Sequence, residues 1–296
     1  MIKLFKKKII FPSLEVFKLS SFDEYKKFLF KNHEKIKKIE IFENNLIDNK
    51  KEYFTIPGIC FVCRKKVNFL VDFKYCYEIN GKKVPNWRER VVCPSCNLNN
   101  RLRATIHIFI QECKPELNSK IYITEQTTPI YKWLKNKFNN VIGSEYLGNS
   151  FPYGKINKYG IRNESLTELS FDNESFDFIL SFDVLEHIPD YKKALKECYR
   201  CLKKNGIFLF TVPFIINSEK NIIRAYIKNG KIIHILSPEY HADPVNPKGC
   251  LCYYHFGWEI LDDLKDAGFK ESYVIIYWSK DYAYLGNFQV IFIAKK

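Results

Sequence analysis

Four cysteines in two matched pairs are the residues with the clearest chemistry in this 296-residue chain. Cys60 and Cys63 form one Cys-x-x-Cys pair, and Cys93 and Cys96 form the other. Each pair can place two thiolates on one metal ion, and four thiolates at ~2.3 Å around a tetrahedral ion form a structural zinc site. Because four thiolates fill the coordination sphere, we expect the zinc to stabilise a module and not to catalyse.

Other uses of these cysteines fit the pattern less well. Two unrelated cysteine pairs, or a redox role for one pair, are the alternatives, but no strand–helix–strand pattern follows the first pair. The 29 residues between the pairs contain alternating segments at 67–73 and 75–79 and the turn sequence Asn80-Gly81. This composition predicts a β-hairpin between the two halves of a zinc ribbon.

A polar segment at residues 237–246 gathers a second group of reactive side chains. It is bracketed by prolines and lacks a regular apolar period, so we expect a loop. The loop contains Glu239, His241 and Asp243. His241 could remove the proton from a hydroxyl with Glu239 or Asp243 orienting it, and His255 is the second choice. The alternative is that these polar side chains only tie the loop to the protein body.

A strand–helix–strand unit at residues 175–214 is the element that must position this chemistry. The apolar run 176–182 predicts a strand buried on both faces, and 207–212 predicts a second one. Between them, Asp190 can cap a helix that we expect to end at Asn205-Gly206. In such units the two strands are parallel and the connection between them is right-handed. Sheets of this kind bind ligands beyond the carboxyl ends of their strands.

Further strands are expected on both sides of this unit. Residues 120–125 and 140–145 predict the first two strands, with Thr128 capping a helix between them, and 159–163 predicts a short third strand. Near the end of the chain, residues 269–279 and 287–294 predict a final, antiparallel pair.

The strand–helix–strand unit resembles the fourth strand, its following helix and the fifth strand of class I S-adenosylmethionine-dependent methyltransferases. The matching residues are Phe176-Asp177, Val184-Leu185-Glu186-His187, Asp190, Leu195, Glu197, Arg200, Leu202-Lys203 and Asn205-Gly206. The resemblance implies an α/β fold, a Rossmann-like sheet of parallel strands with a terminal antiparallel strand, and S-adenosylmethionine as cofactor.

The resemblance extends over residues 60–296. The cysteine ribbon followed by Arg-x-Arg, the Pro-Glu-Tyr-His-x-Asp-Pro segment and the His-Phe-Gly-Trp segment are similar to a ribbon-bearing bacterial group of methyltransferase type 11-like enzymes. The resemblance implies transfer of a methyl group to an oxygen or nitrogen of a small-molecule or glycan acceptor.

The resemblance also assigns residues to the cofactor. The family's glycine-rich loop is missing after the first strand, so Glu125 and the hydroxyls of Thr127 and Thr128 would have to serve. A carboxylate after the second strand suits ribose hydroxyls, although Glu145 could also be a surface acid. The remaining expected cofactor residues are Tyr146 after the second strand, Glu164, Ser165 and Leu166 near adenine, and Ser181, Phe182, Asp183 and His187 after the fourth strand. For His187, packing or capping below the cofactor is favoured over a role as base.

Composition limits the choice of partner. The net charge of +14 invites a nucleic-acid partner, but only 8 of the 47 basic residues are Arg, and a general bias toward Lys explains the charge as well. An RNA methyltransferase is therefore possible but not favoured, and a non-catalytic zinc-bearing scaffold is the second alternative. The chain has no apolar run long enough for a membrane span, so we expect a cytoplasmic protein.

These observations predict three segments. Residues 1–55 form a Lys-rich N-terminal helical segment, 56–100 the zinc ribbon, and 101–296 the methyltransferase domain with a substrate-loop insertion at about 215–254. Cys198 and Cys201 repeat the Cys-x-x-Cys spacing on the apolar face of a helix, where we expect them to pack in the core.

Overall fold

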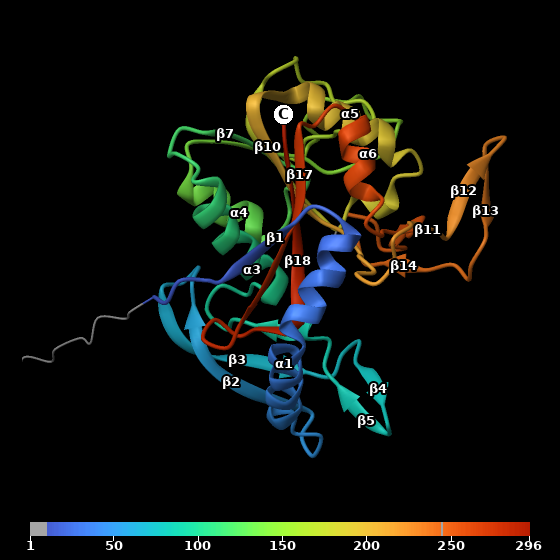
Figure 1. Ribbon diagram of the computed structural model, residues 1–296. Helices are drawn as coiled ribbons and strands as arrows, with labels where there is room; N and C mark the ends of the chain where they lie inside the picture. Colours follow the sequence, from blue (N-terminus) through green and yellow to red (C-terminus); the bar gives the residue numbers. More distant parts are fainter. Residues whose placement is uncertain (1–10, 244) are drawn as a thin grey trace, which may run out of the picture. The chain divides into compact units, whose positions relative to one another are not determined.

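The computed structural model describes residues 11–243 and 245–296 (Figure 1). Residues 1–10 of the expected N-terminal segment and Pro244 of the expected polar loop lie outside the described residues. The described chain divides into two compact units, which are described separately below. Within residues 11–243 and 245–296, no helix combines the length and the apolar character that a membrane span needs.

The ribbon unit comprises the described residues up to Phe17 together with Lys27–Lys114 and Ile276–Val290. This division differs from the expected segments, because residues 101–114 and the stretch Ile276–Val290 join the ribbon. Its elements are most of α1 (Phe22–Leu46), β2 (Tyr53–Cys60), β3 (Lys65–Asp72), β4 (Tyr77–Ile79), β5 (Lys82–Val84), α2 (Trp87–Arg90), β6 (Val91–Val92), α3 (Asn100–Ile108) and the π-helical turn η1 (Phe109–Cys113).

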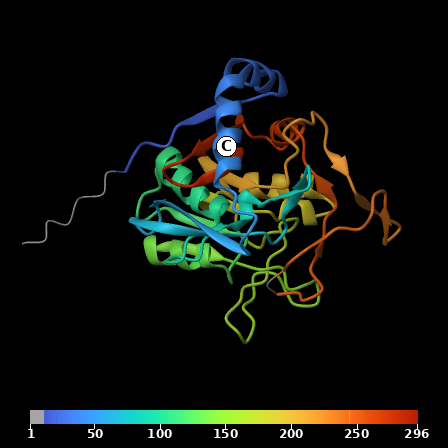
Figure 2. The same ribbon diagram turned by 90° about the horizontal axis from the view of Figure 1, so that it is seen from below.

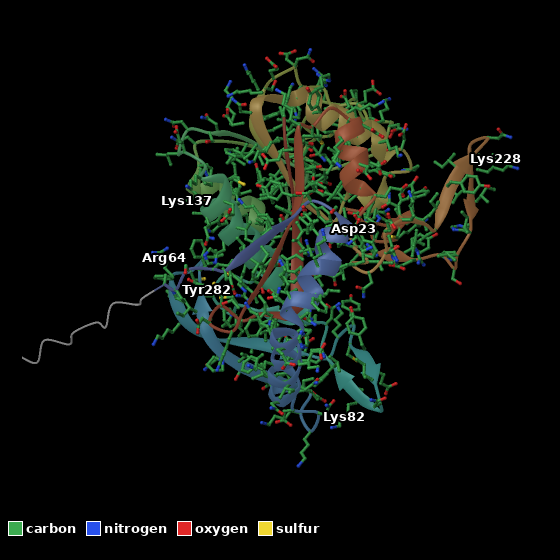
Figure 3. All side chains as sticks on the ribbon, viewed as in Figure 1. Asp23, Arg64, Lys82, Lys137, Lys228 and Tyr282 are labelled. Carbon is green, nitrogen blue, oxygen red and sulfur yellow. The ribbon has the colours of Figure 1, made fainter. Side chains whose placement is uncertain are left out.

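The predicted hairpin between the cysteine pairs is present. Strands β4 and β5 pair antiparallel, and Asn80 and Gly81 form the turn with φ angles of 50° and 73°. Glycine reaches such angles without steric cost and asparagine tolerates them, which is why this dipeptide forms tight hairpin turns. Lys82, labelled in Figure 3, begins the returning strand.

A buried arginine holds the interior of the ribbon unit together. Arg103 is 0% exposed and donates hydrogen bonds to the carbonyl oxygens of Tyr282 (2.7 Å), Ala283 (3.2 Å) and Val91 (3.3 Å). Its guanidinium lies 3.9 Å from the centre of the Phe69 ring. A charge removed from water needs such partners, so Arg103 ties α3 to the ribbon strands and to the segment around residue 283.

The second unit, Lys18–Lys26, Pro115–Ile275 and Ile291–Lys296, carries the parallel strands. The sheet contains β1 (Val16–Leu19), β17 (Glu271–Ser279), β18 (Tyr284–Lys295), β10 (Leu202–Thr211), β9 (Phe176–Phe182), β7 (Lys120–Ile123) and β8 (Asn140–Gly143), in that spatial order. Strands β8, β7, β9 and β10 are parallel, and β18 pairs antiparallel with β10. This mixed sheet fits the expected Rossmann-like fold.

Helices cover both sides of the parallel strands. Figure 1 shows α4 (Pro129–Lys137) on one side, and α5 (Tyr191–Cys201) and α6 (Ile260–Asp266) on the other. The predicted caps are present, because Thr128 accepts from the Tyr131 amide (3.4 Å) and Asp190 from the Lys193 amide (3.1 Å). Cys198 and Cys201 are buried on α5, as predicted.

Two predicted elements differ in the structure. The third strand is reduced to two isolated bridges, Glu145 with Asn163 and Ile156 with Arg162, and Figure 2 shows the yellow-green segment after β8 as an irregular loop. The helix after Asp190 ends at Cys201, because Leu202 already pairs with Phe176 at the start of β10. Asn205-Gly206 therefore lies in an irregularity of β10, where Asn205 has a φ of 64°.

The expected insertion is more regular than a loop. It contains the pairs β11 (Ile222–Ile223) with β16 (Tyr254–His255), β12 (Ala225–Lys228) with β13 (Lys231–His234), and β14 (Tyr240–His241) with β15 (Cys250–Leu251). The β12–β13 hairpin projects from its unit, with Lys228 near its outer end (Figure 3). The expected polar loop thus contains a short strand that is paired with β15.

Candidate functional site

Glu145 lies where the sequence places it, directly after β8, and its side chain is buried. Its Oε1 atom accepts hydrogen bonds from the amides of Gln126 (2.7 Å) and Thr127 (2.9 Å) and from the Thr127 hydroxyl (2.8 Å). Among the described residues Oε2 accepts none. One oxygen therefore holds the loop after β7, and the other is available to a ligand hydroxyl.

The loop after β7 departs from the expected roles. The Thr127 hydroxyl is bound to Glu145, and the Thr128 hydroxyl caps α4. The structure therefore uses both hydroxyls to shape a loop that lacks glycine. Glu125 lies half-buried on the same loop. Gln126, which the sequence analysis did not assign, joins this loop to the next one by accepting from the Arg162 amide (2.9 Å) and donating to the Gly160 carbonyl (2.7 Å).

The residues expected near adenine follow the Glu145 bridge. Glu164 is buried and accepts from Arg162 Nε (2.7 Å) and from the amide and hydroxyl of Ser170 (2.9 and 2.6 Å). Its carboxylate is thus committed to folding this loop. The Ser165 hydroxyl lies 2.9 Å from that of Thr167. Leu166, also expected near adenine, is buried. Tyr146, expected to contact the cofactor after the second strand, is 55% exposed.

The carboxyl end of β9 is mostly closed by its own packing. Ser181 is fully buried and accepts from the Thr124 hydroxyl (3.1 Å), and Phe182 is buried beside it. Asp183 adopts a φ of 54° and accepts from the hydroxyl of Thr211, the last residue of β10 (2.8 Å). This hydrogen bond joins the carboxyl ends of the neighbouring strands β9 and β10.

Glu239 brings the two predicted catalytic histidines together. Its Oε1 atom lies 2.9 Å from His241 Nε2 and 3.1 Å from His255 Nε2, and its Oε2 atom lies 3.1 Å from Arg224. Burial opposes the ionised form, but the bonds from His241 and His255 lower the pKa of the Glu239 carboxyl. Arg224 was not singled out from the sequence, because no motif surrounds it.

A second carboxylate faces His241 from the other side. Glu186, in the 3₁₀ turn η2 (Leu185–His187), is 0% exposed, and its Oε1 atom lies 3.6 Å from His241 Nδ1 and 3.6 Å from His187 Nε2. The carboxylates of Glu186 and Glu239 raise the pKa of His241 to about 9, while burial raises the pKa of Glu186. The cluster therefore stabilises positive charge between its carboxylates.

Asp243 stands apart from this cluster. Its Oδ1 atom accepts from the Val245 amide (2.8 Å), and its Oδ2 atom accepts from the Cys250 thiol (2.9 Å). Burial, with Asp243 next to it, raises the pKa of Cys250 to about 12, so this thiol stays protonated. Asp243 therefore shapes the turn between β14 and β15, and Glu239 is the residue that orients the histidines.

The ribbon unit brings all four predicted cysteines together. Their Sγ atoms lie within 4.8 Å of one another, and the Cys60–Cys96 and Cys63–Cys93 distances are both 3.8 Å. Sulfur atoms at ~2.3 Å around a tetrahedral zinc ion are roughly 3.8 Å apart. Burial and the neighbouring sulfurs raise the pKa of Cys63 to about 12, whereas hydrogen bonds from Cys60 and Cys96 lower the pKa of Cys93.

Comparison with known proteins supports the methyltransferase class. Residues 127–210, from the loop after β7 to β10, match the family described as "Methyltransferase domain". A stretch of 53 residues is 38% identical to a probable S-adenosylmethionine-dependent methyltransferase of Mycolicibacterium smegmatis, covering 18% of this chain and 21% of the relative. A stretch of 60 residues is 37% identical to a sarcosine/dimethylglycine N-methyltransferase of Aphanothece halophytica, covering 20% and 22%.

The chain thus spans about a fifth of the length of these two curated relatives. A solved S-adenosylmethionine-dependent methyltransferase of Thermotoga maritima, described as a possible histamine N-methyltransferase, is 19% identical over 67% of this chain and 97% of that chain, with a TM-score of 0.36. The family match, which covers β8, β9 and most of β10, and the match to the mycobacterial relative support an enzyme of the methyltransferase class.

Proposed function

We propose that the chain is an S-adenosylmethionine-dependent methyltransferase that methylates an oxygen or nitrogen of a small-molecule acceptor, including saccharides. The main support for this proposal is that the sequence match and the candidate site residues fall on the same strands. The methyltransferase-domain match at 127–210 covers the strands whose carboxyl ends carry Glu145 and the Glu186–His187 turn. Ligands of parallel sheets bind at that edge.

The residues around Glu145 fit the cofactor. S-adenosylmethionine supplies a methyl group on a positively charged sulfur, which is displaced in line by the acceptor atom. The Oε2 atom of Glu145 is the group placed to accept a ribose hydroxyl, and the carboxylate favours a cationic ligand. Oε1 meanwhile keeps the glycine-free loop in place through Gln126 and Thr127. The chain's contribution to rate is then mainly positioning.

The geometry favours His255 over His241 as the base that receives a proton from the acceptor. Both ring nitrogens of His241 face carboxylates of the cluster. His255 uses Nε2 to donate to Glu239, and its Nδ1 atom has no hydrogen-bond partner among the described residues. Glu239 therefore orients His255 with Nδ1 free to accept a proton, an arrangement that contributes typically 10²–10⁴-fold to rate.

For the ribbon unit we propose a structural zinc ion bound by Cys60, Cys63, Cys93 and Cys96. The sulfur spacing supports this assignment. The residue after each pair, Arg64 or Asn97, has a positive φ (58° and 57°), which turns the chain back behind its two sulfurs. Four sulfur ligands leave no open position, so the ion would hold the fold only.

Calorimetric titration of the full-length, zinc-loaded protein with S-adenosylmethionine tests the cofactor site. We expect binding in the wild type and a loss of at least ~10-fold in affinity in Glu145→Ala, since a charge-assisted hydrogen bond contributes ~1.5–3 kcal/mol. Glu168→Ala, an exposed glutamate of the same unit, is the matched control. Absence of binding by folded wild type would overturn the proposal and favour the scaffold alternative.

Substitution of the histidines tests the assignment of the base. Once an acceptor is found by screening, His255→Ala should lower kcat by ~10²-fold or more and leave affinity for S-adenosylmethionine unchanged. Full turnover in His255→Ala would exclude this residue as the base. Binding to RNA that falls steeply with salt would instead support the RNA methyltransferase alternative.

A further inference from the structure

We propose that Glu186, His187 and His241 bind a divalent transition-metal ion, separate from the four-cysteine group. All three residues belong to the unit that carries the parallel strands. Their ligand atoms, a Glu186 carboxylate oxygen, His187 Nε2 and His241 Nδ1, lie within 4.8 Å of one another. Two imidazoles and one carboxylate form a ligand set that suits zinc, iron, cobalt or manganese.

The distances within this group fit metal ligands better than hydrogen bonds. Each imidazole nitrogen lies 3.6 Å from Glu186 Oε1, which is beyond a normal hydrogen bond. Nitrogen and oxygen ligands at ~2.1 Å from an ion are roughly 3.0–3.4 Å apart in tetrahedral or octahedral geometry. A shift of a few tenths of an ångström would therefore complete the site.

The outer hydrogen bonds of both histidines fix their orientation. His187 Nδ1 lies 2.9 Å from the carbonyl oxygen of Leu251, which can only accept, so this nitrogen carries the hydrogen. His241 Nε2 lies 2.9 Å from Glu239, so it donates to that carboxylate. In the neutral imidazoles, His187 Nε2 and His241 Nδ1 are then lone pairs facing Glu186. Such outer partners are the usual support of metal-binding histidines.

Glu186 supplies a second, independent observation that points to a ligand here. It is 0% exposed, and neither carboxylate oxygen has a hydrogen-bond partner among the described residues. A buried carboxylate without partners is costly, and the two nearest groups present lone pairs when neutral. A carboxylate oxygen and two imidazole nitrogens that converge on one point can bind a single metal ion between them.

The neighbouring set Glu239, His241 and Cys252 is a weaker candidate. Glu239 already accepts from His241, His255 and Arg224. The Cys252 thiol donates to the Tyr254 carbonyl (3.2 Å), so it carries a proton. Every member of this second set has a hydrogen-bond partner, whereas the oxygens of Glu186 have none among the described residues. Glu239 is thus the outer support of the site, through His241, and not its ligand.

Three protein ligands leave further coordination positions open, as in metal sites that bind a substrate or water. The site lies on the turn after β9 and carries His241 from the insertion, beside the proposed base His255. An acceptor oxygen could occupy an open position, and this use of the ion rests on the proposed methyltransferase function. Binding of the ion itself does not depend on that function.

Titration of the full-length, zinc-loaded protein with Co²⁺ tests the site without cofactor or acceptor. We expect one Co²⁺ per chain in addition to the ribbon zinc, with weak visible bands of nitrogen and oxygen ligands and no intense thiolate charge-transfer band. His187→Ala, His241→Ala and Glu186→Gln should each weaken Co²⁺ binding by at least ~10-fold, because even outer-shell changes cost 10–100-fold. His234→Ala, an exposed histidine of the same insertion, should bind like the wild type.

Three results would overturn the proposal. The first is the absence of Co²⁺ binding to folded, zinc-loaded protein. The second is unchanged binding in both His187→Ala and His241→Ala, which would move the site elsewhere. The third is a thiolate band lost in Cys252→Ser, which would assign the ion to Glu239, His241 and Cys252. Because S-adenosylmethionine is absent throughout, failure here is distinct from failure of the methyltransferase proposal, which the separate cofactor titration decides.

Discussion

The four-cysteine group of the ribbon unit and the Glu186–His187–His241 group of the sheet unit are assembled in opposite ways. The cysteines come as two short pairs of identical spacing, and their four sulfurs lie within 4.8 Å of one another. The second group combines a turn after β9 with a strand of an insertion more than fifty residues later. A complete thiolate shell stabilises a fold, whereas an incomplete mixed shell leaves room for chemistry.

The two groups also differ in how they treat buried charge. In the ribbon unit, Arg103 is fully buried; its two terminal nitrogens donate to three backbone carbonyls, and its Nε atom has no hydrogen-bond partner among the described residues. In the sheet unit, Glu186 is as deeply buried and its oxygens lack hydrogen bonds. The first arrangement favours stability, whereas the second leaves buried carboxylate oxygens without hydrogen bonds, which a bound metal ion would satisfy. The following predictions test this contrast.

The largest effect should come from the cysteines. Cys93→Ser removes a ligand from a site whose zinc contributes on the order of 10 kcal/mol to folding in small zinc modules. We expect loss of the bound zinc and cooperative unfolding of the ribbon unit, measured by elemental analysis and thermal melting. Cys76→Ser, outside the four-cysteine group, is the control. A fully folded, zinc-free Cys93→Ser protein would show that the ribbon does not depend on its ion.

The second largest effect is expected from the buried arginine, Arg103. Arg103→Leu leaves the carbonyls of Tyr282, Ala283 and Val91 without this donor and should lower the free energy of unfolding by about 3–5 kcal/mol. Arg90→Leu, which breaks a partly exposed pair with Asp72, should cost about 1 kcal/mol or less. Urea unfolding measures both. Equal costs would mean that burial does not distinguish the two arginines.

A smaller effect is expected from His107, an imidazole placed in the opposite environment to that of His241. It is buried in the ribbon unit, stacked on Phe61 with ring centres 3.7 Å apart, and burial lowers its pKa to about 4. The unfolded chain binds a proton near pH 6.5 and the folded chain does not, so stability should fall as the pH drops from about 6.5 toward 4.

The loss should approach about 3 kcal/mol at the lower end of that range, because each pKa unit corresponds to 1.36 kcal/mol. His107→Phe keeps the ring stack and should flatten the difference in urea unfolding between pH 7 and pH 5. Acid lability of the cysteine site affects both proteins equally, so the comparison isolates His107. An unchanged slope in His107→Phe would refute this account.

The sequence predicted what depends on short spacing. Cys-x-x-Cys pairs, Asn80-Gly81, the Asp190 cap and the apolar run of β9 each act within a few residues, and the structure confirms these local elements. The end of the helix after Asp190 was predicted wrongly, since pairing of Leu202 with β9 overrode the Asn-Gly signal. Tertiary contacts of this kind can end a helix earlier than the local sequence indicates.

The sheet unit's polar cluster could be predicted only in part. Glu239, His241 and His255 were recognised as candidate residues, but their shared contact arises from the pairing of short strands that no periodicity reveals. Glu186 was visible as part of a family motif and received no role, because its burial and its two imidazole neighbours exist only in three dimensions. Arg224 had no local signal at all.

The smallest and most discriminating effect concerns Glu186 itself. Glu186→Gln replaces a buried, unpartnered carboxylate by a neutral amide of the same shape, whose NH₂ group can donate to the lone pair of His187 or His241. In metal-free protein near pH 9 and above, where His241 loses its proton, we expect the free energy of unfolding to stay level or to rise by about 1–2 kcal/mol, although Co²⁺ binding is weakened by at least ~10-fold. A residue that lowers stability but is needed for binding serves a ligand and not the fold. If urea unfolding instead showed a loss of several kcal/mol, Glu186 would be a structural residue like Arg103, and the contrast between the two regions would disappear.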